Sequence, residues 1–251
     1  MTDEAALSFP ILLTLRVCVA CVLLYLCVGL PCARFCSRRR GLLARALAFL
    51  VTLPLIFPPV AMGFLLLLLL GRNGPIGGPM ERWLGLRIVF SEPGVILSAF
   101  VAGLPLVVRP LQAAMERPEL RRLEEAARTL GCGAMGTFLF VTVPQVSRTL
   151  FSCLLLGVAR ASGEVGITMM LGGNISGRTN TLSLEIFNCV SRGDFDGAMR
   201  LCAVLAVVGT LLYALSCQAR QSFDGRDLKK FKKSLQKSCI LFLSMLYLYT
   251  V

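Results

Sequence analysis

The sequence predicts an all-α, polytopic membrane protein with five core membrane-spanning helices. Apolar residues make up 56% of the chain and charged residues only 16%, whereas a soluble domain carries about 25% charged residues. The apolar residues fall in long blocks, and about 20 of them in a helix suffice to cross a bilayer. The basic residues lie mainly between these blocks, as in the cytoplasmic loops of membrane proteins.

Five apolar segments reach the required length. The first follows an acidic N-terminus and lacks a small-residue cleavage site, so we expect a retained helix and not a secretory signal. Three prolines in the second (Pro54, Pro58 and Pro59) remove backbone hydrogen bonds, so we expect that span to be kinked or broken. The expected spans cover residues 9–30, 43–70, 94–115, 146–171 and 198–217.

Lysine and arginine are divided unequally between the two sides of these spans. Eighteen follow the first, third and fifth spans, and six lie in the other connections. The positive-inside rule therefore predicts an inner-membrane protein with its N-terminus outside and its C-terminus in the cytoplasm. We expect a transmembrane domain in residues 1–221 and a basic, then apolar, tail in residues 222–251. The last thirteen residues of the tail are too few to span a bilayer comfortably. We therefore expect either an interfacial helix or an extension without a role.

The composition disfavours several other functions. The net charge of +12 is accounted for by the loops, so it does not indicate a nucleic-acid partner. The chain has no histidine, and many of its eleven cysteines lie in apolar runs, so we expect free thiols and no metal site. A membrane enzyme would need a cluster of catalytic side chains that this sequence does not suggest. No phosphate-binding Walker A sequence is present, so any ATP must bind elsewhere.

The cytoplasmic segment at residues 116–143 predicts a short amphipathic helix. Charged side chains occupy its polar surface, glycines at 131 and 133 end it, and Pro144 begins the next span. The periodicity fits a helix lying on lipid and equally a helix docked in a partner's groove. The apolar face holds Leu120, Leu123, Ala127 and Leu130, and the polar surface holds Arg121, Arg122, Glu124, Glu125 and Arg128.

The spacing within this segment resembles the EAA loop of ABC importer permeases. That consensus is Glu-Ala-Ala, three residues, Gly, nine residues, Ile, one residue, Leu-Pro. Here Glu125-Ala126-Ala127 is followed at the same spacings by Gly131 and by Val141-Thr142-Val143-Pro144, with valine in place of Ile and Leu. The resemblance implies a type I importer-like fold in which Glu125, Ala126, Ala127, Gly131 and Pro144 couple the chain to an ATPase subunit.

Other stretches resemble the molybdate/tungstate type of permease, over roughly residues 8–220. They are Leu-Pro-Leu-Ile-Phe-Pro-Pro at residues 53–59, the glycines between 71 and 77, and Gly-Asn-Ile at residues 173–175 with the threonines that follow. Sulfate permeases are related but usually carry an additional helix. The resemblance implies import of molybdate or tungstate, with sulfate or thiosulfate as the alternative. A stand-alone channel or scaffold would leave the loop spacing unexplained.

The same resemblance implies a set of partners and no cofactor held by this chain. The partners are a dimer of ATP-binding subunits, which bind ATP and Mg, an extracellular or periplasmic oxyanion-binding protein, a second copy of the chain, and membrane lipid. Transport would proceed by alternating access.

Polar residues inside and beyond the fourth span are candidates for the translocation path. Arg160 and Glu164 are four apart, within reach on one helix face, and charges at membrane depth are costly unless they are paired or face water. They and Ser162 therefore either line the path or form a structural pair. Asn174, Arg178, Thr179 and Thr181 either line the outer mouth or belong to an ordinary polar loop.

Overall fold

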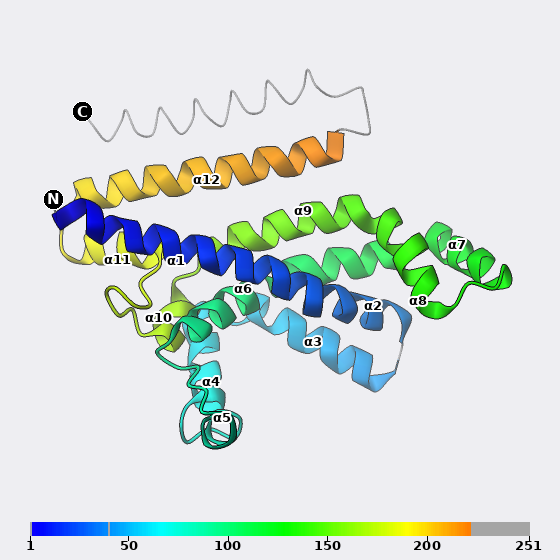
Figure 1. Ribbon diagram of the computed structural model, residues 1–251, viewed down its shortest axis with the longest axis horizontal. Helices are drawn as coiled ribbons and strands as arrows, with labels where there is room; N and C mark the ends of the chain where they lie inside the picture. The colour runs from blue at the N-terminus through cyan, green and yellow to red at the C-terminus, as the bar shows by residue number, and fades with distance from the viewer. Residues whose placement is uncertain (1, 40, 222–251) are drawn as a thin grey trace.

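The computed structural model describes residues 2–39 and 41–221, which form helices and no strand. The predicted tail at residues 222–251 lies outside the described residues. Figure 1 shows the long helices running side by side. The elements are α1 (Thr2–Leu24), the π-helical turn η1 (Tyr25–Gly29), α2 (Leu30–Arg38), α3 (Leu42–Ile56), α4 (Pro59–Leu70), α5 (Gly77–Leu84), α6 (Glu92–Met115), α7 (Pro118–Thr129), α8 (Ala134–Thr137), the π-helical turn η2 (Phe138–Thr142), α9 (Val143–Ser162), α10 (Gly166–Gly172), α11 (Leu182–Ser191) and α12 (Phe195–Gln221).

Three described stretches are long and apolar enough to cross a membrane, namely Ser8–Arg38, Glu92–Met115 and Ala134–Ser162. The second of these matches the expected third span, the other two overlap the expected first and fourth spans with different bounds, and α12, with 27 residues, covers the expected fifth. The first helix continues past residue 30 to Arg38, and its last turns carry two arginines that are paired inside the protein.

The second span is broken, as its prolines predicted. Helix α3 ends at Ile56 and α4 begins at Pro59, where proline fits because the first turn needs no N–H partner. The amide of Phe57 still donates to the carbonyl of Leu53 at 3.0 Å, and that of Met62 to the carbonyl of Pro58 at 3.0 Å. Each of the two short helices therefore keeps a backbone bond at the end that adjoins the break.

The fourth span differs from the expected single helix at residues 146–171. The helix begins earlier, at Ala134, and ends at Ser162, after which the chain turns into the separate short helix α10. Helix α10 packs against α4 and α6. A Cβ atom at Gly166 would lie 2.8 Å from the Cβ of Pro59, so glycine permits this close approach. The break therefore lies against protein, which is where broken membrane helices are tolerated.

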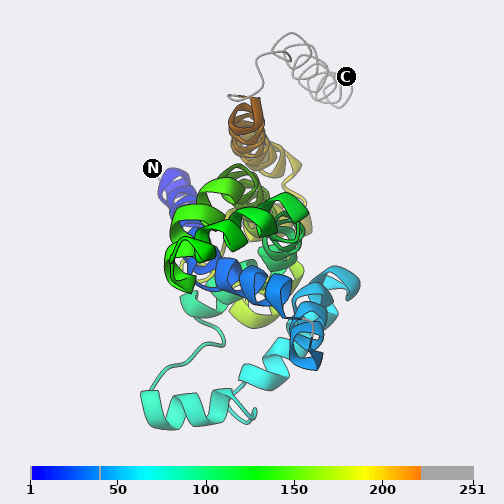
Figure 2. The same ribbon diagram turned by 90° about the vertical axis from the view of Figure 1, so that its right-hand side faces the viewer.

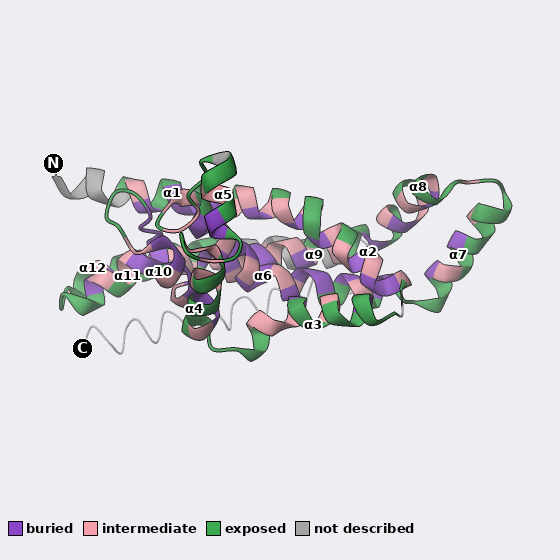
Figure 3. Cartoon of the chain, turned by 90° about the horizontal axis from the view of Figure 1, so that it is seen from below, coloured by how far each residue is buried: buried purple, intermediate pink, exposed green. Residues whose placement is uncertain are grey.

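The core lies where α6 packs against α9, with α1 and α2 alongside. Figure 3 shows many buried residues on α6, with others on α9, α10 and α11. Gly103 and Gly157 allow the closest approach, since a Cβ at Gly103 would lie 2.6 Å from the carbonyl oxygen of Gly157. The buried Tyr25 hydroxyl donates to the carbonyls of Ala99 and Phe100, each at 3.3 Å. Small residues at helix contacts are typical of membrane bundles.

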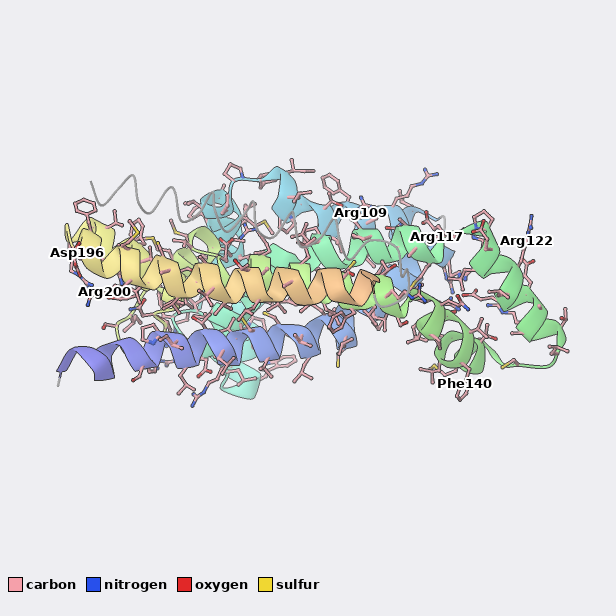
Figure 4. The ribbon with its side chains drawn as sticks, turned by 90° about the horizontal axis from the view of Figure 1, so that it is seen from above. Arg109, Arg117, Arg122, Phe140, Asp196 and Arg200 are labelled. Atoms are coloured by element: carbon pink, nitrogen blue, oxygen red, sulfur yellow. The ribbon has the colours of Figure 1, made fainter. Side chains whose placement is uncertain are left out.

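The bundle has two distinct ends. Helices α7 and α8 project at the end where α2 stops and α3 starts, whereas α10 and α11 lie toward the other end (Figure 1). Arg122 and Phe140 mark the first end, and Asp196 and Arg200 the second (Figure 4). The connection at residues 172–196 contains α11, which was not expected in a polar loop. Helix α5, near residue 80, is set apart from the bundle (Figure 2).

Candidate functional site

Helix α7 confirms the short helix expected between the third and fourth spans. It begins at Pro118, ends at Thr129 and is followed by Gly131 with φ of 88°. The amides of Gly131 and Cys132 donate to the carbonyls of Arg128 and Ala127, each at 3.0 Å. This glycine takes the left-handed conformation that closes a helix, as its position predicted.

Most of the apolar face of α7 is not covered by this chain. Leu120 is buried, but Leu123 is 47% exposed and Leu130 is 88% exposed. Glu125, Ala126 and Pro144, which the EAA resemblance assigned to coupling, are exposed, and Ala127 is half-buried. The end of the bundle therefore presents a charged helix with uncovered leucines.

Glu124 differs from its expected position on the polar surface of α7. Its side chain is only 3% exposed. It pairs with Arg34 at 2.7 Å and with Arg38, both from α2, and accepts a 2.5 Å hydrogen bond from the Thr142 hydroxyl in η2. The Arg34 guanidinium also lies 5.0 Å from the centre of the Phe138 ring. We call Glu124, Arg34, Arg38 and Thr142 the Glu124 cluster.

The sequence carried one signal for this cluster. Glu124 lies four residues after Leu120, so both side chains project from the same side of α7. An apolar face that is defined only by leucine and alanine residues leaves Glu124 out. Its partners are distant in sequence, because Arg34 lies 90 residues earlier and belongs to another helix.

The Glu124 cluster predicts a loss of stability in acid. Burial raises the pKa of the Glu124 carboxyl, but the hydrogen bonds from Thr142 and Arg34 and the charges of Arg34 and Arg38 outweigh it, and the pKa falls below 4.5. Because the folded-state pKa is the lower one, the contribution is fully present above about pH 4.5 and is lost as the pH falls through the folded value. Thermal unfolding of the purified protein against pH should therefore show a steeper acid decline than in Glu124→Gln. Parallel declines would contradict this.

Arg160 and Glu164 form the expected pair, but not on one helix. Arg160 lies in the last turn of α9, whereas Glu164 lies beyond that helix, in the link to α10. The two side chains approach to 2.6 Å, with Arg160 36% exposed and Glu164 2% exposed. The other Glu164 carboxylate oxygen accepts the Ile167 amide at 2.8 Å. Ser162 is buried, and its hydroxyl donates to the carbonyl of Ala159.

Of the four candidates for the outer mouth, two are buried, one is half-buried and one is exposed. Thr179 and Thr181 are buried, where Thr179 accepts the Ile175 amide at 2.9 Å and Thr181 caps α11. Asn174 adopts a positive φ of 49° and exchanges hydrogen bonds with Asn188. Arg178 is exposed and lines a cavity of about 710 Å³ together with residues of α4, α5 and the segment before α6.

Arg178 thus joins other charged residues that the sequence did not place together. Arg72 and Arg87 line the same cavity, and both pair with Glu81, at 3.6 Å and 2.8 Å. Within residues 2–39 and 41–221, no group of three His, Cys, Asp or Glu side chains is placed to hold a metal ion. The charged residues that line this cavity are therefore three arginines and one glutamate.

Residues 26–220 match the model of the family described as "Binding-protein-dependent transport system inner membrane component". The chain belongs to this family. The match includes α7, the Glu124 cluster and both broken spans. The permease is accordingly a multi-pass inner-membrane protein and the membrane component of a transport system.

Several curated relatives carry transport names. The permease is 35% identical over 205 residues to the Molybdenum transport system permease protein ModB of Haemophilus influenzae, covering 81% of this chain and 89% of the relative. It is 37% identical over 210 residues to ModB of Azotobacter vinelandii, covering 83% and 92%. It is also 37% identical over 188 residues to the Sulfate transport system permease protein CysW of a Synechocystis strain, covering 72% and 66%.

A solved structure shares the fold. One chain of a bacterial alginate ABC transporter, in complex with a periplasmic protein bound to alginate pentasaccharide, superposes with a TM-score of 0.67. The sequence identity is 19%, and the match covers 86% of the permease and 79% of that chain. The fold of the permease is therefore that of an ABC importer permease.

Proposed function

We propose that the permease imports molybdate or tungstate as the membrane component of an ABC importer. The relatives named for molybdenum transport match over most of their own length, and they support this substrate class. The observation that supports an importer is the exposed motif on α7, which leaves Glu125 and Ala126 free to meet a separate ATP-binding subunit. That subunit would bind ATP and Mg.

The proposed assembly follows from this role. Two copies of the permease would enclose the path, two ATP-binding subunits would receive the α7 helices in the cytoplasm, and an oxyanion-binding protein would meet the opposite face. The charge distribution supports the N-terminus outside and α7 inside. Arg178 with its neighbouring arginines, and Arg160 in the membrane, remain the candidates for contact with a dianion.

Sulfate is the second candidate substrate, because the sulfate permease CysW of Synechocystis matches at a similar identity. The substrate test is uptake of labelled molybdate by vesicles that contain the complete transporter, with excess sulfate as competitor. Uptake that persists in excess sulfate supports molybdate, and uptake abolished by sulfate favours the second candidate. No ATP-dependent uptake of either anion would contradict the proposed function.

Docking through α7 makes a separate prediction. We expect Glu125→Gln and Gly131→Val to weaken capture of the ATP-binding subunit by the tagged permease on the order of thirtyfold, which corresponds to the roughly 2 kcal/mol of an interface hot spot. The first removes an exposed charge, and the second places a branched side chain at a φ of 88° that it adopts only with strain.

The matched control for docking is Asp196→Asn, because Asp196 is an exposed carboxylate at the opposite end of the bundle (Figure 4). Wild-type capture by both α7 variants would show that this segment is not the docking surface. Equal loss in the Asp196 variant would show that the effect is not specific to α7.

A further inference from the structure

Helix α7 is attached to the bundle on one side by two buried side chains on successive turns. They are Leu120, which packs into the main apolar core, and Glu124 in its cluster. The remaining α7 side chains are exposed or half-buried. An apolar contact is non-directional, so Leu120 alone would leave α7 free to turn about that point. A second, directional attachment is needed to fix the orientation of the helix.

The Glu124 cluster supplies that attachment and joins three segments. The carboxylate of Glu124 takes Arg34 and Thr142 on one oxygen and Arg38 on the other. Arg34 also donates to the Thr142 hydroxyl at 3.3 Å, which closes a ring of contacts. The end of the first span, α7 and the turn that leads into the fourth span therefore meet at one carboxylate.

The chemistry of the cluster favours a rigid connection. Hydrogen bonds between ionised partners are short and directional, and leaving one partner of a buried ion pair alone is strongly unfavourable. The side chains of the two arginines are only 17% and 25% exposed, so water cannot freely replace the carboxylate as their partner. Moving α7 away from α2 would break these contacts. Moving α7 together with the end of the first span and the turn before the fourth span would keep them.

We propose that Glu124 is a positioning residue for energy coupling, which locks α7 to the first and fourth spans so that movement of α7 reaches both. This inference rests on the proposed function, because it assumes that an ATP-binding subunit moves α7. It differs from docking, since Glu124 is buried within this chain, whereas Glu125 is exposed.

The test compares Glu124→Gln with Glu119→Gln in the complete transporter, reconstituted in liposomes with its ATP-binding subunit and substrate-loaded binding protein. Glu119 lies on the same helix but is exposed. ATP hydrolysis and labelled molybdate uptake are measured together. We expect Glu124→Gln to keep its ATP hydrolysis and to lower uptake per ATP by about tenfold, the lower end of what losing a hydrogen bond to a charged group gives. Glu119→Gln should keep the wild-type ratio of uptake to ATP hydrolysis, because it breaks no contact of the Glu124 cluster.

A merely structural role would lower hydrolysis and uptake in proportion to the amount of assembled complex, and would leave their ratio unchanged. That result, or a wild-type ratio in Glu124→Gln, would overturn the inference. Thr142→Val provides a second variant, because it removes one hydroxyl at nearly constant volume and keeps every charge. It should also lower uptake per ATP, but by less than Glu124→Gln does. If the wild-type transporter itself shows no ATP-driven uptake, the proposed function is wrong, and not only the locking role of Glu124.

Discussion

Replacing Glu164 with alanine is expected to lower the free energy of unfolding by about 3 kcal/mol, the cost of breaking a buried ion pair. Its carboxylate holds Arg160 on one oxygen and the first turn of α10, through the Ile167 amide, on the other. Both partners lose their acceptor in the variant. The measurement is thermal or denaturant unfolding of the purified permease in detergent.

Arg160→Gln is the matched comparison, because it removes only the cation and leaves the bond from Glu164 to the Ile167 amide in place. It strands the Glu164 carboxylate, which is 2% exposed, without its cation, so we expect a loss of about 3 kcal/mol here too. A loss below about 1 kcal/mol, as for a solvent-exposed pair, would contradict the assignment of a buried ion pair. Uptake by an assembled Arg160→Gln transporter then tests the path: normal uptake would exclude Arg160 from it, and a selective loss would support it.

Gly166→Val is the second substitution with a large expected effect. The Cβ atom would lie 2.8 Å from the Cβ of Pro59 and 3.1 Å from the amide nitrogen of Val60, so the clash involves backbone and cannot be relieved by a side-chain rotation. We expect a loss of about 3 kcal/mol, the upper part of the range for overpacked sites. Reduced yield of folded protein and a lower unfolding temperature would report it.

Gly209→Val is the control for this clash, because no atom lies within 4 Å of a Cβ at that position on α12. It should leave stability near the wild-type value in the isolated permease. A Gly166 variant as stable as the Gly209 variant would show that α10 and α4 separate without cost, and that the two breaks are not mutually supported.

The parts of the fold that depend on local sequence were predictable. The break in the second span follows from prolines, and the end of α7 follows from Gly131, whose φ of 88° is a local property of the chain. The break after Ser162 was not predictable in the same way. It lies inside the expected fourth span, and it is stable because Gly166 fits against Pro59, a neighbour more than a hundred residues away.

The site was predicted unevenly for the same reason. The exposed motif on α7 can be read from spacing, because it needs nothing else in this chain. Glu124 was assigned to the surface because its burial depends on two arginines from the first span. Thr179 and Thr181 are donors and acceptors in the sequence, but in the fold they serve their own turn and helix cap. Local patterns identify polar residues, and tertiary contacts decide where those residues face.

Helix α9 runs without a break from Val143 to Ser162, so the number of residues between two positions on it sets the angle between their side chains. Pro144 of the coupling motif and Arg160, near the break after Ser162, both lie on this helix. Because an α-helix turns by about 100° per residue, one residue added or removed between them would rotate Arg160 by that angle relative to Pro144. Individual lipid-facing side chains on such a helix can change freely. The number of residues between Pro144 and Arg160 cannot change, because it sets the direction in which each end of the helix faces.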